Sequence, residues 1–316
     1  MPGTAFPRAV GKVNIGGSTM RYIPSIFSGK MLRKYYDSSV VPGITNTDYE
    51  GEIKKYGDTV YIRETPDITI RDYVKGQTLV NEQPEASSQA LLIDEGKYWS
   101  FVTDDVDDAQ TDIKGHVTQW SADAAEQMRI ELDSSFLTDS DIYDGMVAAN
   151  KGATAGVKSG SYALGVSAGD AVTVTKANIL DKIVDCGSVL DEQNVPEQGR
   201  YLVLPIRLIN LIKKSDIKDV SMTGDAKSVV RTGLIGGIDR FTVYASNLLS
   251  YTGSGADRAW RCLFGINYGI TFATQLTNTK TLDNPDGFGR LFRGLIVYGY
   301  KMVKTEAVGC LFAKAG

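Results

Sequence analysis

The chain has few of the residue types on which most enzymes and metalloproteins depend. Its 316 residues include one histidine, His116, and three cysteines. A single histidine excludes zinc sites that need two or more, and a Ser-His-Asp triad would have to use this one imidazole. We therefore expect no enzyme activity, no catalytic residue, no metal site and no cofactor, and we interpret His116 as a surface or partner contact.

The cysteines do not form a recognisable framework. Cys186, Cys262 and Cys310 are far apart in the sequence, and no C-x-x-C pair occurs. An odd number of cysteines, far apart and with small or apolar neighbours, is typical of buried, reduced thiols. The chain also lacks an apolar run of about 18 residues, and its first residues lack the apolar core of a signal peptide. We expect no contact with a membrane.

Acidic residues are missing from the first 36 positions, although the net charge is −4. This stretch carries only bases: Arg8, Lys12, Arg21, Lys30, Arg33 and Lys34. Residues 64–108 show the opposite balance, with eleven acids and three bases. The overall charge argues against a dedicated nucleic-acid binder. A basic arm can meet phosphate, an acidic scaffold or the acidic region of a neighbouring subunit, and a solvated terminus is the alternative.

Two local clusters resemble ligand sites only superficially. Gly233, Gly236 and Gly237 lead into the strand-like run FTVY, so no helix N-terminus follows to bind phosphate, and turns or bulges are expected. The acids at 104, 105, 107 and 108 could hold a divalent cation, but the loop pattern of an EF-hand is absent. We interpret them as the charged start of the helix that follows.

The hydrophobic pattern predicts an α+β protein. Between Gly57 and Tyr73, apolar and charged residues alternate, which predicts a β-hairpin whose arms of about a dozen residues would reach roughly 40 Å. A helix is expected from Thr111 or Asp112 to about Leu137. Its proposed apolar face comprises Ile113, Val117, Trp120, Ala124, Ala125, Met128, Leu132 and Phe136.

Further elements follow along the chain. A helix is expected after Thr175, a buried strand at Arg200–Leu204, and a helix from Pro205 to about Lys214. Residues 138–170 read as loops with a short hairpin. Two antiparallel strands are expected at Leu291–Tyr300 and Lys304–Ala313.

Three segments carry a family resemblance. They are DYEGEIKKYGDTVYI with LLIDEGKYWSFVTDDVDDAQ, the run ILDKIVDCGSVLDEQNVPEQGRYLVLPIRLINLIKKSD, and the closing NPDGFGRLFRGLIVYGYKMVKTEAVGCLFA. In order and content they resemble the major capsid proteins of tailed bacteriophages with the Hong Kong 97 (HK97) fold, and most closely the podovirus coat-protein branch. The resemblance covers most of residues 46–313.

The resemblance implies a division of the chain. Residues 1–45 would be an N-terminal arm, and 46–110 the extended β-hairpin loop (E-loop) with adjoining peripheral-domain strands. Residues 111–137 would be the spine helix of the peripheral domain, 138–274 the axial domain, and 275–316 the C-terminal return to the peripheral domain. Arg71, Asp72, Tyr73 and Lys75 would be the loop residues that contact a neighbouring subunit, and the basic arm would face the inside of the shell.

The implied function is self-assembly, as hexamers and pentamers, into the icosahedral head shell that encloses double-stranded DNA. The implied location is the virion, with assembly in the host bacterial cytoplasm. Expected partners are a scaffolding protein, a portal protein, a decoration protein in some phages, and the packaged DNA through non-specific contacts. An encapsulin-like shell around a cargo enzyme is the alternative with the same fold.

Overall fold

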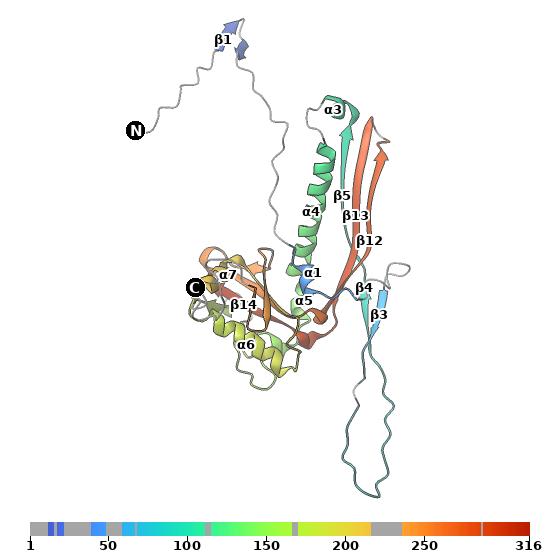
Figure 1. The fold of residues 1–316 in the computed structure, drawn as a ribbon, viewed down its shortest axis with the longest axis vertical. Helices are drawn as coiled ribbons and strands as arrows, with labels where there is room; N and C mark the ends of the chain where they lie inside the picture. Colours follow the sequence, from blue (N-terminus) through green and yellow to red (C-terminus); the bar gives the residue numbers. More distant parts are fainter. Residues whose placement is uncertain are drawn as a thin grey trace, which may run out of the picture.

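Two sheets and a long helix organise the chain (Figure 1). The structure is a computed structural model that describes residues 12–15, 18–21, 39–48, 59–66, 68–110, 115–165, 170–215, 236–285 and 287–316. A seven-stranded sheet holds most of the core, and a three-stranded sheet of much longer strands extends away from it beside helix α4. Separate helices and mainly antiparallel strands confirm the predicted α+β class.

The seven-stranded sheet has the order β6-β14-β11-β7-β9-β8, and β10 pairs with β11. Every residue of β7 is buried, as the apolar run predicted, and most positions of β11 and β14 are buried too. Strands that are buried on both faces show that the sheet is covered on both sides. The strands are β6 Val172–Val174, β7 Arg200–Leu204, β8 Gly237–Ile238, β9 Phe241–Ala245, β10 Tyr251–Thr252, β11 Ala259–Ile266 and β14 Val308–Ala315.

The two helices beside this sheet confirm the sequence prediction. Helix α6 spans Ile179–Glu192 and buries apolar residues three or four positions apart, including Ile183, Cys186 and Leu190. Helix α7 spans Ile206–Lys214, with Pro205 at its N-cap, one position before the expected first turn. Gly152 and Gly165, and Ala155 and Tyr162, form isolated bridges in the region where a short hairpin was expected.

The three-stranded sheet consists of β12 Ile270–Asp283, β13 Gly289–Met302 and β5 Glu95–Asp104, in the order β12-β13-β5. Helix α4, His116–Thr138, lies along it (Figure 1). Partly buried Lys97, Trp99 and Phe101 alternate in β5 with exposed residues, because the helix covers one face of the sheet only.

The predicted start of the long helix was wrong. Residues Asp105–Gln110 form a separate short helix, α3, and Asp104 accepts a hydrogen bond from the Val106 amide (2.8 Å) at its start. Helix α4 begins only at His116, after Gly115 in the left-handed region (φ 76°). Asp105, Asp107 and Asp108 therefore lie in the short helix, Asp104 is the last residue of β5, and none of the four is at the start of the long helix.

The predicted apolar face of the long helix is correct only near its C-terminal end. Leu132, Phe136 and Leu137 are buried in the main core, whereas Trp120 is 43% exposed. The N-terminal half of α4 lies beside the three-stranded sheet (Figure 1), and the exposure of Trp120 shows that this sheet covers the helix incompletely.

The strands β3 Thr59–Arg63 and β4 Ser88–Leu92 form the base of the predicted hairpin. The strand ladder does not continue outward, so the expected strand at Ile68 and Ile70 was wrong. Pro66 and Pro84 stand almost opposite each other in the register of this pair, and proline cannot donate to a ladder.

The C-terminal strand pair was also predicted wrongly. Strand β13 pairs with β12 and β5, whereas β14 pairs with β11 and β6 after the short helix η6, Thr305–Ala307. The last strand of the expected 275–316 return therefore lies in the seven-stranded sheet. The remaining elements are β1 Lys12–Ile15, β2 Ser18–Arg21, α1 Val41–Ile44, α5 Ser140–Asp144, η1 Ala148–Asn150, η4 Gly255–Asp257 and η5 Asn267–Gly269.

One main core joins these parts. It includes residues of α1, the end of α4, α6, α7 and the seven-stranded sheet, and also Phe272, Tyr298 and Met302 at the base of the long sheet. A small second cluster, Ile62, Leu91, Ile93 and Ala273, anchors the base of the hairpin. The hairpin is therefore fixed at its base, while residues beyond Glu64 contribute to neither cluster.

Candidate inter-subunit surfaces

Residues 64–87, here called the extended loop, project away from both sheets (Figure 1). Every described residue from Ile68 to Ser87 is exposed. Six of them are large and apolar, and five of these six are 64–70% exposed: Ile68, Tyr73, Val74, Leu79 and Val80. The sixth, Ile70, is 90% exposed. Apolar groups gathered in this way mark a surface that another molecule covers.

Contacts within the extended loop hold its two arms together. Arg71 forms an ion pair with Glu82, and the Thr69 amide donates to the same carboxylate (3.1 Å). These contacts lower the pKa of Glu82, the hydrogen bond from Thr69 being the largest cause. At the tip, the Gln77 amide donates to the Val74 carbonyl (3.1 Å) in a turn that contains Gly76 at φ 89°.

The structure therefore separates the four predicted loop residues. Arg71 is engaged inside the loop, whereas Asp72, Tyr73 and Lys75 are exposed around the turn. Their contact with a neighbouring subunit stays a prediction.

The basic arm is described only in part. Lys12 and Arg21 pair across the β1–β2 ladder. Arg8, Lys30, Arg33 and Lys34 lie outside the described residues. The predicted role of the arm stays a prediction as well.

An aromatic cluster that was not predicted from the sequence lies between α4 and the long sheet. Phe101 stacks on Phe292 (5.3 Å between ring centroids) and meets Trp120 edge-on (5.9 Å). The His116 ring also lies edge-on to Trp120 (4.9 Å). His116 is buried, so its interpretation as a surface contact was wrong.

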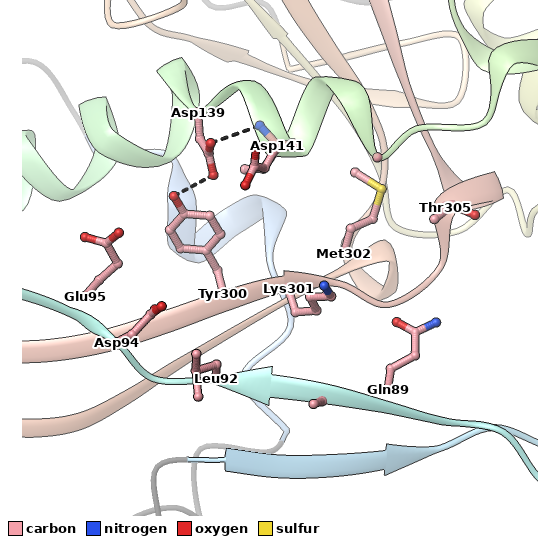
Figure 2. A pocket seen from close by; sticks show the side chains of 13 residues that line it. Gln89, Leu92, Asp94, Glu95, Asp139, Asp141, Tyr300, Lys301, Met302 and Thr305 are labelled. Atoms are coloured by element: carbon pink, nitrogen blue, oxygen red, sulfur yellow. Dashed lines mark hydrogen bonds between the residues drawn. The ribbon is translucent and has the colours of Figure 1, made fainter.

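A hollow of about 510 Å³ lies where the long sheet meets the end of α4 (Figure 2). Asp94, Glu95, Asp139 and Asp141 line it together with Lys301. Tyr300 donates to Asp139 (2.8 Å), and the other oxygen of that carboxylate accepts from the Asp141 amide (3.0 Å) at the start of α5. Burial, with the nearby Asp139 carboxylate, raises the pKa of Tyr300. The contact joins β13 to the connection between α4 and α5.

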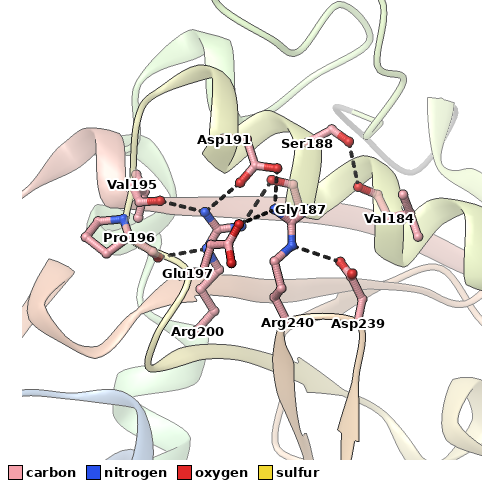
Figure 3. Close-up of polar contacts among 10 residues, drawn as sticks. All are labelled: Val184, Gly187, Ser188, Asp191, Val195, Pro196, Glu197, Arg200, Asp239 and Arg240. Atoms are coloured by element: carbon pink, nitrogen blue, oxygen red, sulfur yellow. Dashed lines mark hydrogen bonds and ion pairs between the residues drawn. The ribbon is translucent and has the colours of Figure 1, made fainter.

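Arg200 is the centre of a buried polar network beside α6 (Figure 3). It is 1% exposed and donates to Asp191 (2.7 Å) and to the carbonyls of Val195 (2.6 Å), Pro196 (2.9 Å) and Gly187 (3.3 Å). Arg240 donates to the second oxygen of Asp191 (2.6 Å). The network ties the end of α6 to β7 and to the start of β9, which is a structural role.

The electrostatics of Asp191 follow from these two partners. Partial desolvation would raise its pKa, but the hydrogen bonds and charges of Arg200 and Arg240 outweigh that effect, and the pKa of Asp191 is lowered. The lowered pKa favours the ionised carboxylate, and each of its oxygens accepts a hydrogen bond from an arginine.

The cysteines and the possible metal ligands were compared with the expectations from the sequence. Cys186, Cys262 and Cys310 are buried free thiols, as expected, and burial raises the pKa of all three, to about 12 for Cys310. Within the described part of the chain, no group of three or more His, Cys, Asp or Glu side chains is arranged to hold a metal ion. No described helix is both long and apolar enough to cross a membrane.

Comparison with known proteins identifies the fold. No protein-family model matches the chain, and no curated protein gives a significant match. Among solved structures, that of Mycobacterium phage Che8 has 22% identity and a TM-score of 0.72 over 92% of this chain and 97% of the other. The capsid structure of cyanophage P-SCSP1u has 12% identity and a TM-score of 0.68 over 96% and 97%. The mature capsid of bacteriophage PhiM1 has 13% identity and a TM-score of 0.63 over 99% of both chains.

The chain has the HK97-type capsid fold. The fold implied by the sequence resemblance is thus confirmed. The podovirus branch stays a prediction, because the similar structures include a capsid of Myoviridae phage XM1 as well (14% identity, TM-score 0.60). The division of the chain into a peripheral and an axial domain stays a prediction.

Proposed function

We propose that this chain is the major capsid protein of a tailed bacteriophage. The observation that carries the proposal is the extended loop, which exposes six large apolar side chains on a chain with the fold of phage capsids. If a neighbouring subunit covers these side chains, each contributes about 1.5–3 kcal/mol. The loop therefore stabilises an assembly far more than it stabilises its own subunit.

The mechanism of assembly is geometric. A loop that projects from one subunit onto a different surface of the next forms a heterologous contact. Such contacts close into rings around symmetry axes, here the pentamers and hexamers of an icosahedral shell. Many moderate contacts, engaged together, then hold each subunit more firmly than any single contact does.

The role is structural and not enzymatic. The single histidine packs in an aromatic cluster, the three thiols are buried, and the ionised Asp191 is held by two arginines. Expected partners beyond the chain itself are a scaffolding protein, a portal protein and a decoration protein. The basic arm would contact packaged double-stranded DNA without sequence preference, or the scaffold. The protein would be assembled in the host cytoplasm and would reside in the virion.

Electron microscopy and mass measurement of the purified chain, expressed with and without a co-expressed scaffolding protein, test the proposal. We expect closed shells of uniform diameter that exceed the 34.3 kDa subunit mass by two orders of magnitude or more. A small, uniform oligomer under both conditions would contradict it. Shells that package a host enzyme in place of DNA would favour the encapsulin alternative, which no contact in the described residues supports.

A further inference from the structure

The extended loop has to keep its shape without a strand ladder. Pairing of β3 with β4 ends at Arg63 and Ser88, and Pro66 and Pro84 lie just beyond these residues on the two arms. The loop projects away from both sheets (Figure 1), and no described residue of it belongs to a core cluster. Contacts from one arm to the other are therefore what can fix the shape of its described part.

One carboxylate makes these contacts. Glu82 forms an ion pair with Arg71 through Oε1 and accepts a hydrogen bond from the Thr69 amide through Oε2 (3.1 Å). Between the base of the loop and its turn at 74–77, no other hydrogen bond or ion pair among the described residues crosses from one arm to the other. We call the two contacts of this carboxylate the Glu82 tie.

The Glu82 tie fixes a stretch of backbone and not a single point. Thr69 and Arg71 are two positions apart on one arm, and both are bound by the same carboxylate on the other arm. Ile70 lies between them and is 90% exposed, the largest fraction among the exposed large apolar side chains of the described residues. The tie therefore holds in place the apolar group that the loop offers most fully to another molecule.

Such a contact matters more for binding than for folding. An exposed ion pair adds little to the stability of a folded subunit. A free loop, however, loses conformational freedom when a partner covers it, and a loop that already has its bound shape loses less. Because each subunit of a shell is held by several contacts at once, a small gain at every loop adds up over the assembly.

We propose that Arg71 and Glu82 are positioning residues, which hold the extended loop in the shape that a neighbouring copy of this chain binds. They act through the loop and not by touching the neighbour, so Arg71 has a different role from the contact that the sequence resemblance implied. The proposal rests on the proposed function, because it requires a neighbour that covers the loop.

A charge swap tests the proposal. Arg71→Glu and Glu82→Arg each place two like charges across the loop, and we expect for either variant about a tenfold lower yield of closed shells, with the thermal midpoint of the subunit changed by less than about 3 °C. The double variant restores an ion pair of the opposite polarity and should recover most of the yield. Single variants that assemble normally would overturn the proposal. A double variant as poor as the single ones would overturn it in favour of direct contacts with the neighbour.

Glu85→Arg is the matched control. Glu85 lies three positions from Glu82 on the same arm, is exposed, and forms no hydrogen bond or ion pair with a described residue. The variant makes the same change of charge and should assemble like the unmodified chain. A loss equal to that of Glu82→Arg would show a general effect of charge and overturn the proposal.

A measurement on the unassembled subunit separates this proposal from the proposed function. Exchange of the Thr69 amide hydrogen with water, followed by NMR, should be about fivefold faster in Glu82→Ala than in the unmodified chain, because the amide loses its acceptor. The Gln77 amide, which donates to the Val74 carbonyl (3.1 Å) at the turn, should exchange at the same rate in both. A chain that forms no shells but shows this difference would refute the capsid role and keep the Glu82 tie. Shells without the difference would refute the tie and keep the capsid role.

Discussion

At the scale of single residues, the surroundings of a side chain determine how much it contributes to stability. Trp120 and Phe136 both lie on the predicted apolar face of α4, yet only Phe136 reaches the main core. Trp120 is 43% exposed and contacts two rings on one side only. Periodicity places both residues on the same side of the helix, but it does not predict how completely other elements cover each of them.

The Trp120→Ala variant should lose about 1–2 kcal/mol of unfolding free energy, because half of the ring is already in water and the edge-on contacts add little. Full burial, which the helical pattern suggested, would predict about 3–5 kcal/mol. Denaturant titration measures the loss, with Phe136→Ala as the control expected at about 3–5 kcal/mol. Equal losses for the two variants would show that Trp120 is buried.

Asp133 is a buried carboxylate on α4 that fixes the chain before α1. It accepts hydrogen bonds from the Val40 amide (2.7 Å) and the Ser39 hydroxyl (2.9 Å). Burial raises its pKa, against the opposing effect of these hydrogen bonds. We expect Asp133→Asn to lose about 1–3 kcal/mol, because the new amide turns N–H groups towards one of the donors.

The pH dependence of that loss has a definite sign. Because the pKa of Asp133 is higher in the folded than in the unfolded state, the native state binds a proton more readily. The free energy of unfolding therefore rises as the pH falls from the folded pKa towards the unfolded value of 3.8. The stability difference between unmodified chain and Asp133→Asn should therefore grow between pH 6 and pH 4. Chemical unfolding at several pH values measures it, and a constant difference would refute the raised pKa.

At the scale of elements, local signals predicted the pieces that a small region can stabilise. Helices α6 and α7 and strand β7 formed where periodicity, the early proline and the apolar run indicated. The prediction of a long hairpin was wrong beyond the base of the loop. There, two prolines interrupt the ladder, and no second sheet among the described residues supports the arms. An element needs both a compatible pattern and a surface to pack on.

Deletion of the loop tip, Asp72–Glu82, should leave the subunit folded but unable to form closed shells. No described residue of the tip belongs to a core cluster, so we expect the thermal midpoint to change by less than about 3 °C. Thermal unfolding and electron microscopy check the two halves of the prediction. A deletion that unfolds the subunit would show that the loop supports its own chain.

The network at the end of α6 offers a second test at this scale. Asp191→Asn should lose about 1.5–3 kcal/mol near pH 7, because buried Arg200 loses its charged partner but keeps three carbonyl acceptors. A carboxylate with a lowered folded pKa stabilises the protein at pH values above its unfolded pKa. This stabilisation is lost as the pH falls through the folded pKa. The difference from the unmodified chain should therefore shrink below about pH 4, opposite to Asp133→Asn.

At the scale of the whole molecule, charge is divided between an arm without acids and an acid-rich middle. Reversal of Arg8, Lys12 and Arg21 to glutamate tests what the arm meets. If the arm binds phosphate, empty shells should form normally, and DNA retention should fall and depend less steeply on salt. If the arm binds a scaffold or a neighbouring subunit, shell formation itself should fail. Normal shells with normal DNA content would refute all three roles.

The sequence alone determined those features that depend on short stretches of chain. Composition excluded His-rich metal sites, periodicity identified α6, α7 and β7, and three segments in order carried the resemblance to the capsid fold. The tertiary structure decided which sheet receives each strand, because strand pairing depends on residues far apart in the sequence. It placed β14 beside β11 instead of β13, buried His116, and left Trp120 half exposed. It also brought Arg290 opposite Thr103 in the β13–β5 register, although the two residues are 187 positions apart in the sequence. No local pattern reports such a contact, because only the folded sheet creates it.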